Sequence, residues 1–316
     1  MISKTADILA MAADGTVYVG TGNGLYRSTD DGLNWQDITT NLPIRDIGDI
    51  AVLNDGTVLA ATWGSGIFRS TNKGQSWTES NTGITQPRIY CLLVSFPGII
   101  YAGSYGDGVF RSTDQGLSWT TMPLSGYIYD MGESPSGDIF AIKSDNGVYR
   151  SPDNGLSWIK SDQGIPYFRG YGFGFRSAME IMFGVTVPQG MYRSLDGGAT
   201  WSAFNDGYSL SSTRSLTQTS DGNWFAPTYG DGVYVLPQDS SRWQARNQGM
   251  QGSWIYAMAS DPSGALFAGG FGGVRVSRDA GVSWSPTNKN IGIDYVLDLL
   301  YTNNTLLAAG NPGGVS

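Results

Sequence analysis

Seven of the ten tryptophans recur along this 316-residue chain with gaps of 42, 42, 39, 43, 42 and 41 residues. They are Trp35, Trp77, Trp119, Trp158, Trp201, Trp243 and Trp284. A fixed period of about 40 residues indicates one supersecondary unit that is copied many times. The copies expected from this period cover residues 4–41, 42–85, 86–124, 125–165, 166–210, 211–250 and 251–290, followed by a partial copy over 291–316.

Most of these tryptophans close the phrase Ser-x-Asp-x-Gly-x-x-Trp, of which Ser28–Trp35 is the first copy. The aspartate position is held by Asp30, Asn72, Asp114, Asp153, Asp196 and Asp279, and the sixth copy keeps only Trp243. A tight turn leaves backbone N–H groups without ladder partners, and Ser and Asp side chains accept such bonds locally. Because Asn72 can accept the same bonds but cannot act as a carboxylate acid or base, the phrase is expected to be a structural staple rather than an active site.

Three short apolar runs precede each phrase, and a fourth is expected to begin at the tryptophan. In the first copy the runs are Ile8–Met11, Thr16–Val19 and Gly24–Arg27, and the Asp14-Gly15 link between the first two is typical of a hairpin turn. Four antiparallel strands per repeat of about 40 residues are typical of a propeller blade. The sequence therefore predicts an all-β, single-domain β-propeller over residues 1–316, with seven complete blades and a partial eighth. A seven-bladed ring with a displaced extra hairpin and a piece of a longer array are the alternatives.

The repeated phrase resembles the Asp-box, or bacterial neuraminidase, repeat, and the resemblance covers nearly the whole chain. Families with this repeat include sialidases, xyloglucan-type endoglucanases, sortilin-like receptors, photosystem II assembly factors and secreted bacterial repeat proteins. The resemblance implies the propeller fold and does not choose among these functions. Since the related repeat proteins are mostly exported, it also implies an extracellular or periplasmic location in a bacterium, for a chain that lacks its signal peptide.

Composition excludes several classes of function. The formal charge of −8 without a Lys/Arg cluster disfavours nucleic acid as a partner, and the sequence has no apolar run of about 18 residues that could span a membrane. The absence of histidine excludes Ser-His-Asp and Cys-His catalysis and the usual zinc sites, so no metal or cofactor is expected. The single cysteine, Cys91, lies in an apolar run and is expected to be buried and inert.

Propeller topology directs the search for a binding site to the face opposite the tryptophan phrases, where the second-to-third turns and the starts of the first strands meet. Aromatic rings stack on sugar rings and guanidinium groups hold carboxylates or hydroxyls. The candidate ligand-binding residues on this face are Trp63, Tyr105, Tyr229, Phe271, Trp254, Arg45, Arg88, Arg169 and Arg214. The alternative interpretation is that the aromatic residues cap blade ends and the arginines are solvated or paired with neighbouring aspartates.

Three functions remain open at this stage. The leading hypothesis is a non-catalytic scaffold that binds a glycan or a protein on that face. The second is a glycoside hydrolase or lyase, which would need two facing carboxylates; its candidates are Asp46, Asp49, Asp130, Glu133 and Glu180. The third is an architectural module of a longer exported protein. Sialidases carry an aromatic-Arg-Ile/Leu-Pro motif, and neither Phe168-Arg169-Gly170 nor Pro87-Arg88-Ile89 matches it.

Overall fold

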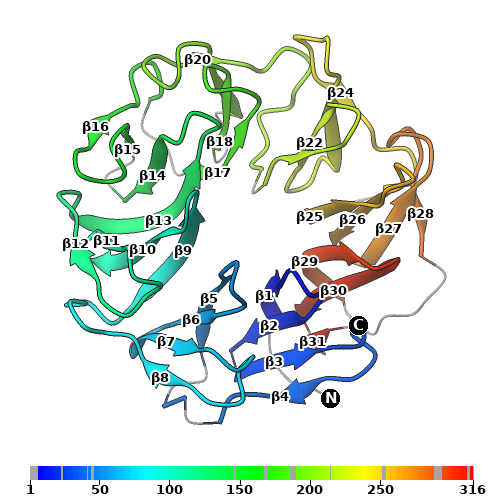
Figure 1. The fold of residues 1–316 in the computed structure, drawn as a ribbon. Coiled ribbons are helices and arrows are strands. Elements are labelled where there is room, and N and C mark those ends of the chain that lie inside the picture. The colour runs from blue at the N-terminus through cyan, green and yellow to red at the C-terminus, as the bar shows by residue number, and fades with distance from the viewer. Residues whose placement is uncertain are drawn as a thin grey trace. The chain divides into compact units, whose positions relative to one another are not determined.

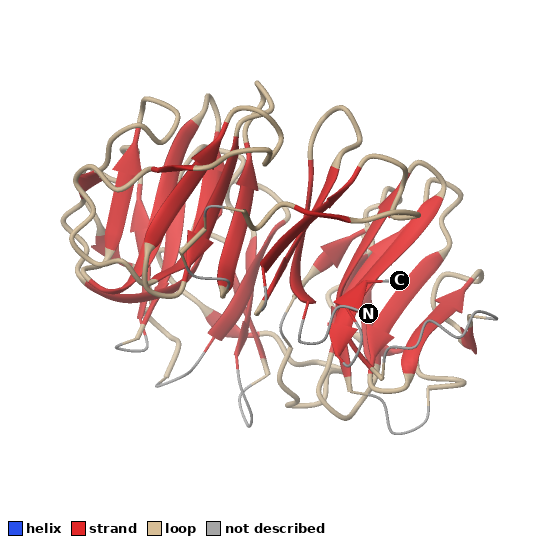
Figure 2. Cartoon of the chain, turned by 90° about the horizontal axis from the view of Figure 1, so that it is seen from below, coloured by secondary structure: helices blue, strands red, loops and turns tan. Residues whose placement is uncertain are grey.

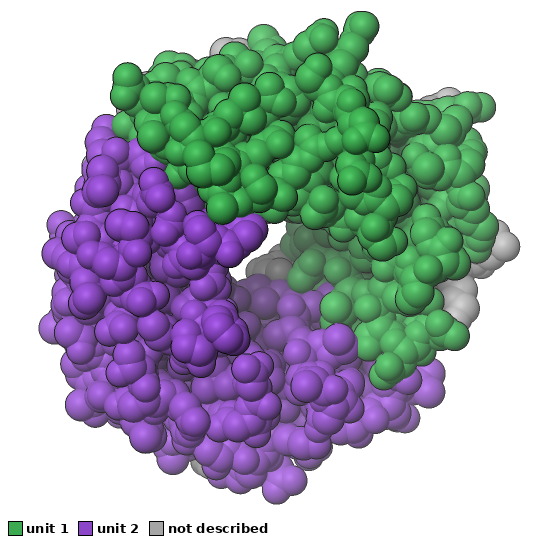
Figure 3. Space-filling model, turned by 45° about the horizontal axis from the view of Figure 1, so that its top comes forward, with its two compact units in different colours: residues 1, 162–316 green, residues 2–161 purple. Residues whose placement is uncertain are grey.

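The computed structural model describes residues 6–22, 24–40, 42–43, 46–144, 147–166, 170–185, 190–213, 215–250, 254–287, 294–311 and 314–315. This part of the chain consists of strands and loops and contains no helix (Figure 2). It forms two compact units, which we call the N-terminal unit (residues 2–161) and the C-terminal unit (residues 162–316; Figure 3). The candidate residues Arg45, Arg169 and Arg214 lie outside the described residues.

The N-terminal unit contains the first four repeats (Figure 1). Its strands in the first two repeats are β1 (Ala6–Met11), β2 (Val17–Thr21), β3 (Gly24–Ser28), β4 (Gln36–Asp37), β5 (Ile47–Val52), β6 (Val58–Thr62), β7 (Gly66–Ser70) and β8 (Thr78–Glu79). Those of the next two are β9 (Ile89–Ser95), β10 (Ile99–Gly106), β11 (Val109–Ser112), β12 (Thr120–Thr121), β13 (Gly126–Glu133), β14 (Ile139–Lys143), β15 (Gly147–Ser151) and β16 (Ile159–Lys160).

The C-terminal unit contains the later repeats. Its first strands are β17 (Gly170–Phe175), β18 (Ile181–Val185), β19 (Met191–Ser194), β20 (Ser202–Ala203), β21 (Thr217–Gln218), β22 (Trp224–Pro227), β23 (Val233–Leu236) and β24 (Gln244–Ala245). They are followed by β25 (Ile255–Ser260), β26 (Leu266–Gly270), β27 (Gly273–Ser277), β28 (Ser285–Pro286), β29 (Tyr295–Thr302), β30 (Thr305–Asn311) and β31 (Gly314–Val315).

Five repeats each fold into a separate four-stranded antiparallel sheet with the strands in sequence order, as in β1-β2-β3-β4. The last sheet has three described strands, β29-β30-β31, and the third and fourth repeats share one sheet because Tyr105 on β10 pairs with Tyr127 on β13. The fourth strand is only two residues long in each complete repeat and begins after the tryptophan, not at it as the sequence had predicted.

The second strands carry the core of each repeat. All five residues of β2, β6 and β18 are buried. These strands lack the alternation of buried and exposed residues that is typical of a strand with one solvent-exposed face. Successive repeats within a unit share this core: Tyr18 of the first repeat lies in one cluster with Ile47 and Ile50 of the second. Their burial is the main favourable contribution to folding.

The turns closed by the repeated phrase make the local bonds expected from the sequence. In the first copy the Ser28 hydroxyl donates to Asp30 Oδ1 at 2.8 Å and accepts from the Gly32 amide at 2.8 Å, while Asp30 Oδ1 accepts from the Asn34 amide at 2.9 Å. In the second copy Asn72 Oδ1 accepts the equivalent bond from the Ser76 amide at 2.9 Å. An amide oxygen therefore replaces the carboxylate without loss of the turn.

The tryptophan of one repeat also holds the chain that leaves the previous repeat. Trp119 Nε1 donates to the carbonyl oxygen of Ser80 at 2.8 Å, and the Trp119 amide donates to Thr82 at 2.8 Å. The indoles of Trp77, Trp243 and Trp284 make the equivalent bond. Each donates to the carbonyl oxygen of the residue three positions after the preceding tryptophan of the series. Trp158 follows the one short gap of 39 residues, and its indole bonds instead to Gly155 in its own turn at 3.1 Å.

Candidate functional site

We call the turns that end at the repeated tryptophans the tryptophan turns. Five aromatic side chains gather in the N-terminal unit at the end of the sheets opposite these turns. We call Trp63, Tyr90, Tyr105, Tyr127 and Tyr129 the N-terminal aromatic cluster. The ring centroids of Trp63 and Tyr90 are 4.5 Å apart, those of Tyr90 and Tyr105 are 5.6 Å apart, and those of Tyr105 and Tyr127 are 4.2 Å apart. Trp63, Tyr127 and Tyr129 keep 39%, 37% and 40% of their surfaces exposed. The cluster is thus packed on one side and open to a ligand on the other.

Bulges in the first strands place two of these tyrosines. The pairing of β9 with β10 skips Tyr90, and the pairing of β13 with β14 skips Tyr129, so each residue is the extra one of a β-bulge. A bulge bends its strand and changes the direction of the side chain that it carries. Tyr90 and Tyr129 meet with their ring centroids 6.0 Å apart as a result.

A glycine at the same position of the second repeat makes room for Trp63. The β5–β6 pairing skips Gly48, where a Cβ atom would lie 3.1 Å from Trp63 Nε1 and 2.7 Å from the carbonyl oxygen of Ile89. Because glycine has no side chain, the indole can lie directly against the strand. The backbone of Trp63 also forms an isolated antiparallel β-bridge with Arg88 of the next repeat.

Arg88 supplies a positive charge at this cluster. Its guanidinium carbon lies 5.6 Å from the centroid of the Tyr105 ring, within the range of a cation–π contact, and its side chain is exposed. Burial raises the pKa of the Tyr90 phenol, and the neighbouring phenols of Tyr105 and Tyr129 raise it further. The Tyr90 phenol therefore stays protonated at neutral pH and can donate a hydrogen bond to a ligand.

The C-terminal unit has a second group of aromatic residues at the equivalent end of its sheets. Tyr229 packs edge-on against Trp254 at 6.0 Å and against Tyr256 at 5.2 Å, while Phe271 packs against Tyr295 at 5.2 Å. Trp254 and Phe271 are 51% and 54% exposed.

The structure thus brings together some of the residues expected from the sequence and adds others. Trp63, Tyr105 and Arg88 meet in one unit, and Tyr229 and Trp254 meet in the other. Tyr90, Tyr129 and Tyr295 were not among the candidates. The alternation of Tyr127 and Tyr129 around buried Ile128 was the available signal, but the bulges that gather these rings leave no mark in a single sequence.

Four of the five carboxylates considered for catalysis are bound to backbone amides or to arginine. Asp49 accepts bonds from the amides of Ile50 and Leu92, both at 2.7 Å, and Asp130 accepts one from Met131 at 2.8 Å. Glu133 accepts a bond from the Phe96 amide at 3.1 Å. Glu180 pairs with Arg176 at 3.3 Å and with Arg193 at 3.8 Å. These contacts hold the four carboxylates in place.

Two further properties bear on chemistry at the site. Cys91 is buried, and this burial raises the pKa of its thiol well above the usual range, as expected for an inert residue. The described residues contain no group of three or more Cys, Asp or Glu side chains arranged to hold a metal ion. No helix long and apolar enough to cross a membrane is found in the described ranges.

No family model and no curated protein matches this sequence, and the comparison with solved structures gives the fold. The chain is similar to the computationally designed Ika8 protein, with 11% identity, a TM-score of 0.73, and coverage of 99% of this chain and 95% of that one. It is similar to a catalytically inactive virginiamycin B lyase from Staphylococcus aureus in which a histidine is replaced by alanine, with 14% identity, a TM-score of 0.64, and coverage of 84% and 92%.

The GH74 xyloglucanase from Xanthomonas campestris is a third similar structure, with 16% identity and a TM-score of 0.63. The match covers 99% of this chain and 51% of that one, so this chain spans about half the length of the xyloglucanase. Extracellular domains of bacterial proteins also have this fold. At such low identity the similarity carries the fold alone: the chain has the all-β architecture of a β-propeller built from four-stranded antiparallel sheets.

Proposed function

We propose that this protein is a non-catalytic binding scaffold and that its N-terminal aromatic cluster binds a glycan. The observation that carries the proposal is the cluster itself, in which three of five packed rings stay more than a third exposed. Aromatic faces stack on the apolar faces of sugar rings, and phenol and indole groups donate hydrogen bonds to hydroxyls. Arg88 adds a guanidinium group that favours an acidic sugar.

Two observations favour binding over catalysis. Replacement of one histidine leaves the similar lyase catalytically inactive, and this sequence contains no histidine. Four of the five carboxylates considered for a glycoside hydrolase already accept bonds from backbone amides or pair with arginines. The GH74 xyloglucanase demonstrates that a protein with this fold can act on a glycan, and we carry over only the class of ligand.

The remaining expectations from the sequence also belong to this proposal. We infer that the repeated phrases are Asp boxes and that seven complete repeats and a partial eighth make one propeller domain over residues 1–316. The scaffold would act outside the cytoplasm, as an independent binder or as a module of a longer exported protein. A protein ligand at the same face is the competing partner for the aromatic cluster.

A glycan array with purified protein, followed by calorimetry on the best ligand, tests the proposal. We expect Trp63→Ala to weaken binding about tenfold, because loss of one stacking ring removes on the order of 1.5 kcal/mol. Phe96→Ala is the matched control: Phe96 is 85% exposed and directly follows β9, at the end of that strand opposite Tyr90. Thermal melts of both variants check that the fold is kept.

Three results would contradict the proposal. The first is that no glycan on the array is retained. The second is that Trp63→Ala binds as tightly as the unchanged protein. The third is that Trp254→Ala, in the C-terminal unit, abolishes binding while Trp63→Ala does not. Turnover of fluorogenic glycosides that disappears in Asp49→Asn or Asp130→Asn would favour the hydrolase instead.

A further inference from the structure

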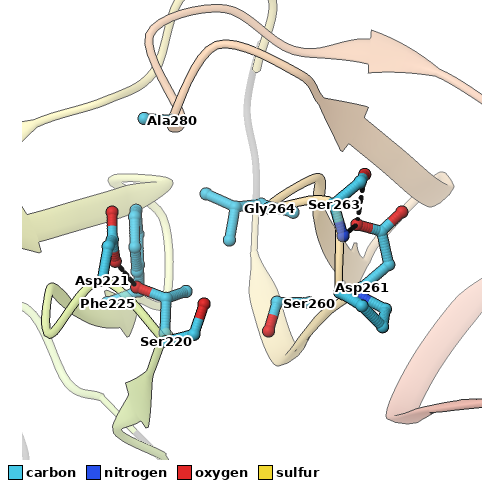
Figure 4. A pocket seen from close by; sticks show the side chains of 11 residues that line it. Ser220, Asp221, Phe225, Ser260, Asp261, Ser263, Gly264 and Ala280 are labelled. Carbon is cyan, nitrogen blue, oxygen red and sulfur yellow. Dashed lines mark hydrogen bonds between the residues drawn. The ribbon is translucent and has the colours of Figure 1, made fainter.

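A pocket of about 310 Å³ lies in the C-terminal unit, at the end of the sheets that carries the tryptophan turns. Its walls come from the β21–β22 turn with Asp221, the β25–β26 turn with Asp261, and the turn before β28 with Ala280. Asp221 lies beside Phe225 on one side of the pocket, and Asp261 lies on the other side with Ser260 and Ser263 (Figure 4). Phe225 and Leu266 are almost completely buried and supply the apolar part of the lining.

Neutral groups hold the two carboxylates in place. Asp221 Oδ2 accepts a bond from Asn223 Nδ2 at 2.7 Å, and Asp261 Oδ1 accepts bonds from the Ser263 hydroxyl at 2.6 Å and the Ala265 amide at 2.9 Å. Such bonds orient a carboxylate but leave its charge in place. Among the described residues, no lysine or arginine lies within ion-pair distance of Asp221 or Asp261.

The first two repeats show what occupies the equivalent place in the N-terminal unit. Asp14 in the β1–β2 turn and Asp221 in the β21–β22 turn occupy equivalent positions, and each is followed by a glycine. Lys73 in the second tryptophan turn and Ala280 in the seventh also occupy equivalent positions. Both residues have a positive φ, 57° for Lys73 and 56° for Ala280. Lys73 Nζ lies 2.5 Å from Asp14 Oδ2, and this bond is the largest of the interactions that lower the pKa of Asp14 to about 2. An ammonium group of the chain itself therefore neutralises the first of these aspartates.

The arginine that holds the backbone of the Lys73 turn also has no counterpart in the sixth repeat. Arg27 donates to the carbonyl oxygen of Lys73 at 2.6 Å and pairs in the sheet with Gln36. In the sixth repeat the position equivalent to Arg27 is Val235, which pairs with Gln244 and carries no charge. The sixth and seventh repeats thus keep the acidic residue of this arrangement and lack both of its cations.

From this comparison we propose that the pocket beside Asp221 binds a primary alkylammonium group. The ammonium donates charge-assisted hydrogen bonds to Asp221, and its alkyl stem lies against Phe225 and Leu266, as the stem of a lysine covers apolar surface elsewhere in proteins. The group is either the side chain of a lysine on a partner protein or a free alkylamine. This site lies at the end of the sheets opposite the aromatic residues of its unit and is independent of glycan binding.

Titration of the ¹⁵N-labelled protein with n-butylamine, followed by NMR, tests the proposal. We expect saturable shifts at the amides around Asp221 and Ala280, a dissociation constant on the order of millimolar for a single small cation, and no shifts with n-butanol. Asp221→Asn should weaken binding about tenfold, because it removes the charge from the acceptor. Asp14→Asn is the matched control, since the ammonium of Lys73 already occupies its site, and it should leave butylamine binding unchanged.

Ala280→Lys supplies a second readout that does not depend on a ligand. Lys73 at φ 57° shows that lysine is accommodated in this turn. The new ammonium should occupy the pocket, abolish butylamine binding and raise the melting temperature, whereas Ala280→Gln should do neither. The peptide Gly-Lys-Gly with blocked termini separates the two sources: tighter binding than butylamine assigns the site to a protein lysine, and weaker binding assigns it to a free amine. The proposal is overturned if butylamine shifts no amides at the pocket, or if Asp221→Asn binds it unchanged.

Discussion

The indole bond that joins one repeat to the next should be an energetic link, and Trp119→Phe tests it. Trp119 is 4% exposed, and its Nε1 donates to the Ser80 carbonyl at 2.8 Å. Phenylalanine leaves that buried carbonyl without its donor, which costs about 1–3 kcal/mol, and the smaller ring removes about 1 kcal/mol of apolar burial. We therefore expect Trp119→Phe to destabilise the protein by about 2–4 kcal/mol.

Trp158→Phe is the control within the same unit. Its indole is only partly buried and bonds to Gly155 in its own turn, so the same substitution breaks no indole hydrogen bond between repeats. Thermal unfolding monitored by circular dichroism measures the difference. At roughly 2 °C per kcal/mol for a chain of this size, Trp119→Phe should lower the melting temperature by about 4–8 °C. Equal shifts in the two variants would refute the idea that the tryptophans act as links between repeats.

Three further predictions test other parts of the fold. Gly83→Ala should destabilise by several kcal/mol, because its φ is +90° and a Cβ would lie 2.0 Å from the carbonyl oxygen of Trp119; Gly56→Ala, with φ +83° and nothing within 4 Å, should cost only about 1 kcal/mol in a urea melt. Asn247→Ala removes an acceptor for the Val233 amide and a donor to the Asp231 carbonyl, both at 2.7 Å, and should lower stability by about 1–3 kcal/mol, while Asn247→Asp, which keeps the acceptor, should lower it less. Burial raises the pKa of Asp114, but bonds from Ser118 and Ser112 lower it more, to about 2. Because this folded-state pKa lies below the unfolded value of 3.8, its contribution is complete above pH 4 and is lost as the pH falls towards 2. Melting temperatures from pH 5 to pH 2 should therefore fall less steeply for Asp114→Asn, and a parallel fall would contradict this assignment.

Much of the fold could be predicted from the sequence because the interactions that specify it are local. The spacing of the tryptophans predicted the repeats, and the Ser-x-Asp-x-Gly phrase predicted turns whose bonds span two to four residues. The link between repeats was not predicted, because the partner of the Trp119 indole lies 39 residues earlier in the chain. Asn247 was also missed, since its bond to Val233 joins residues 14 apart.

The binding surfaces depend on contacts that only the tertiary structure decides. The sequence by itself determined that aromatic residues and arginines recur at the turns, and it indicated Trp63, Tyr105 and Arg88. Bulges at Tyr90 and Tyr129 decide which rings meet, because each bulge shifts the register of its strand by one residue. This register is set by pairing with the neighbouring strand. The ammonium pocket likewise depends on adjacency: Ala280 leaves space beside Asp221 only because the seventh repeat packs against the sixth. Local turns are encoded by neighbouring residues, whereas these sites arise where separate repeats come into contact.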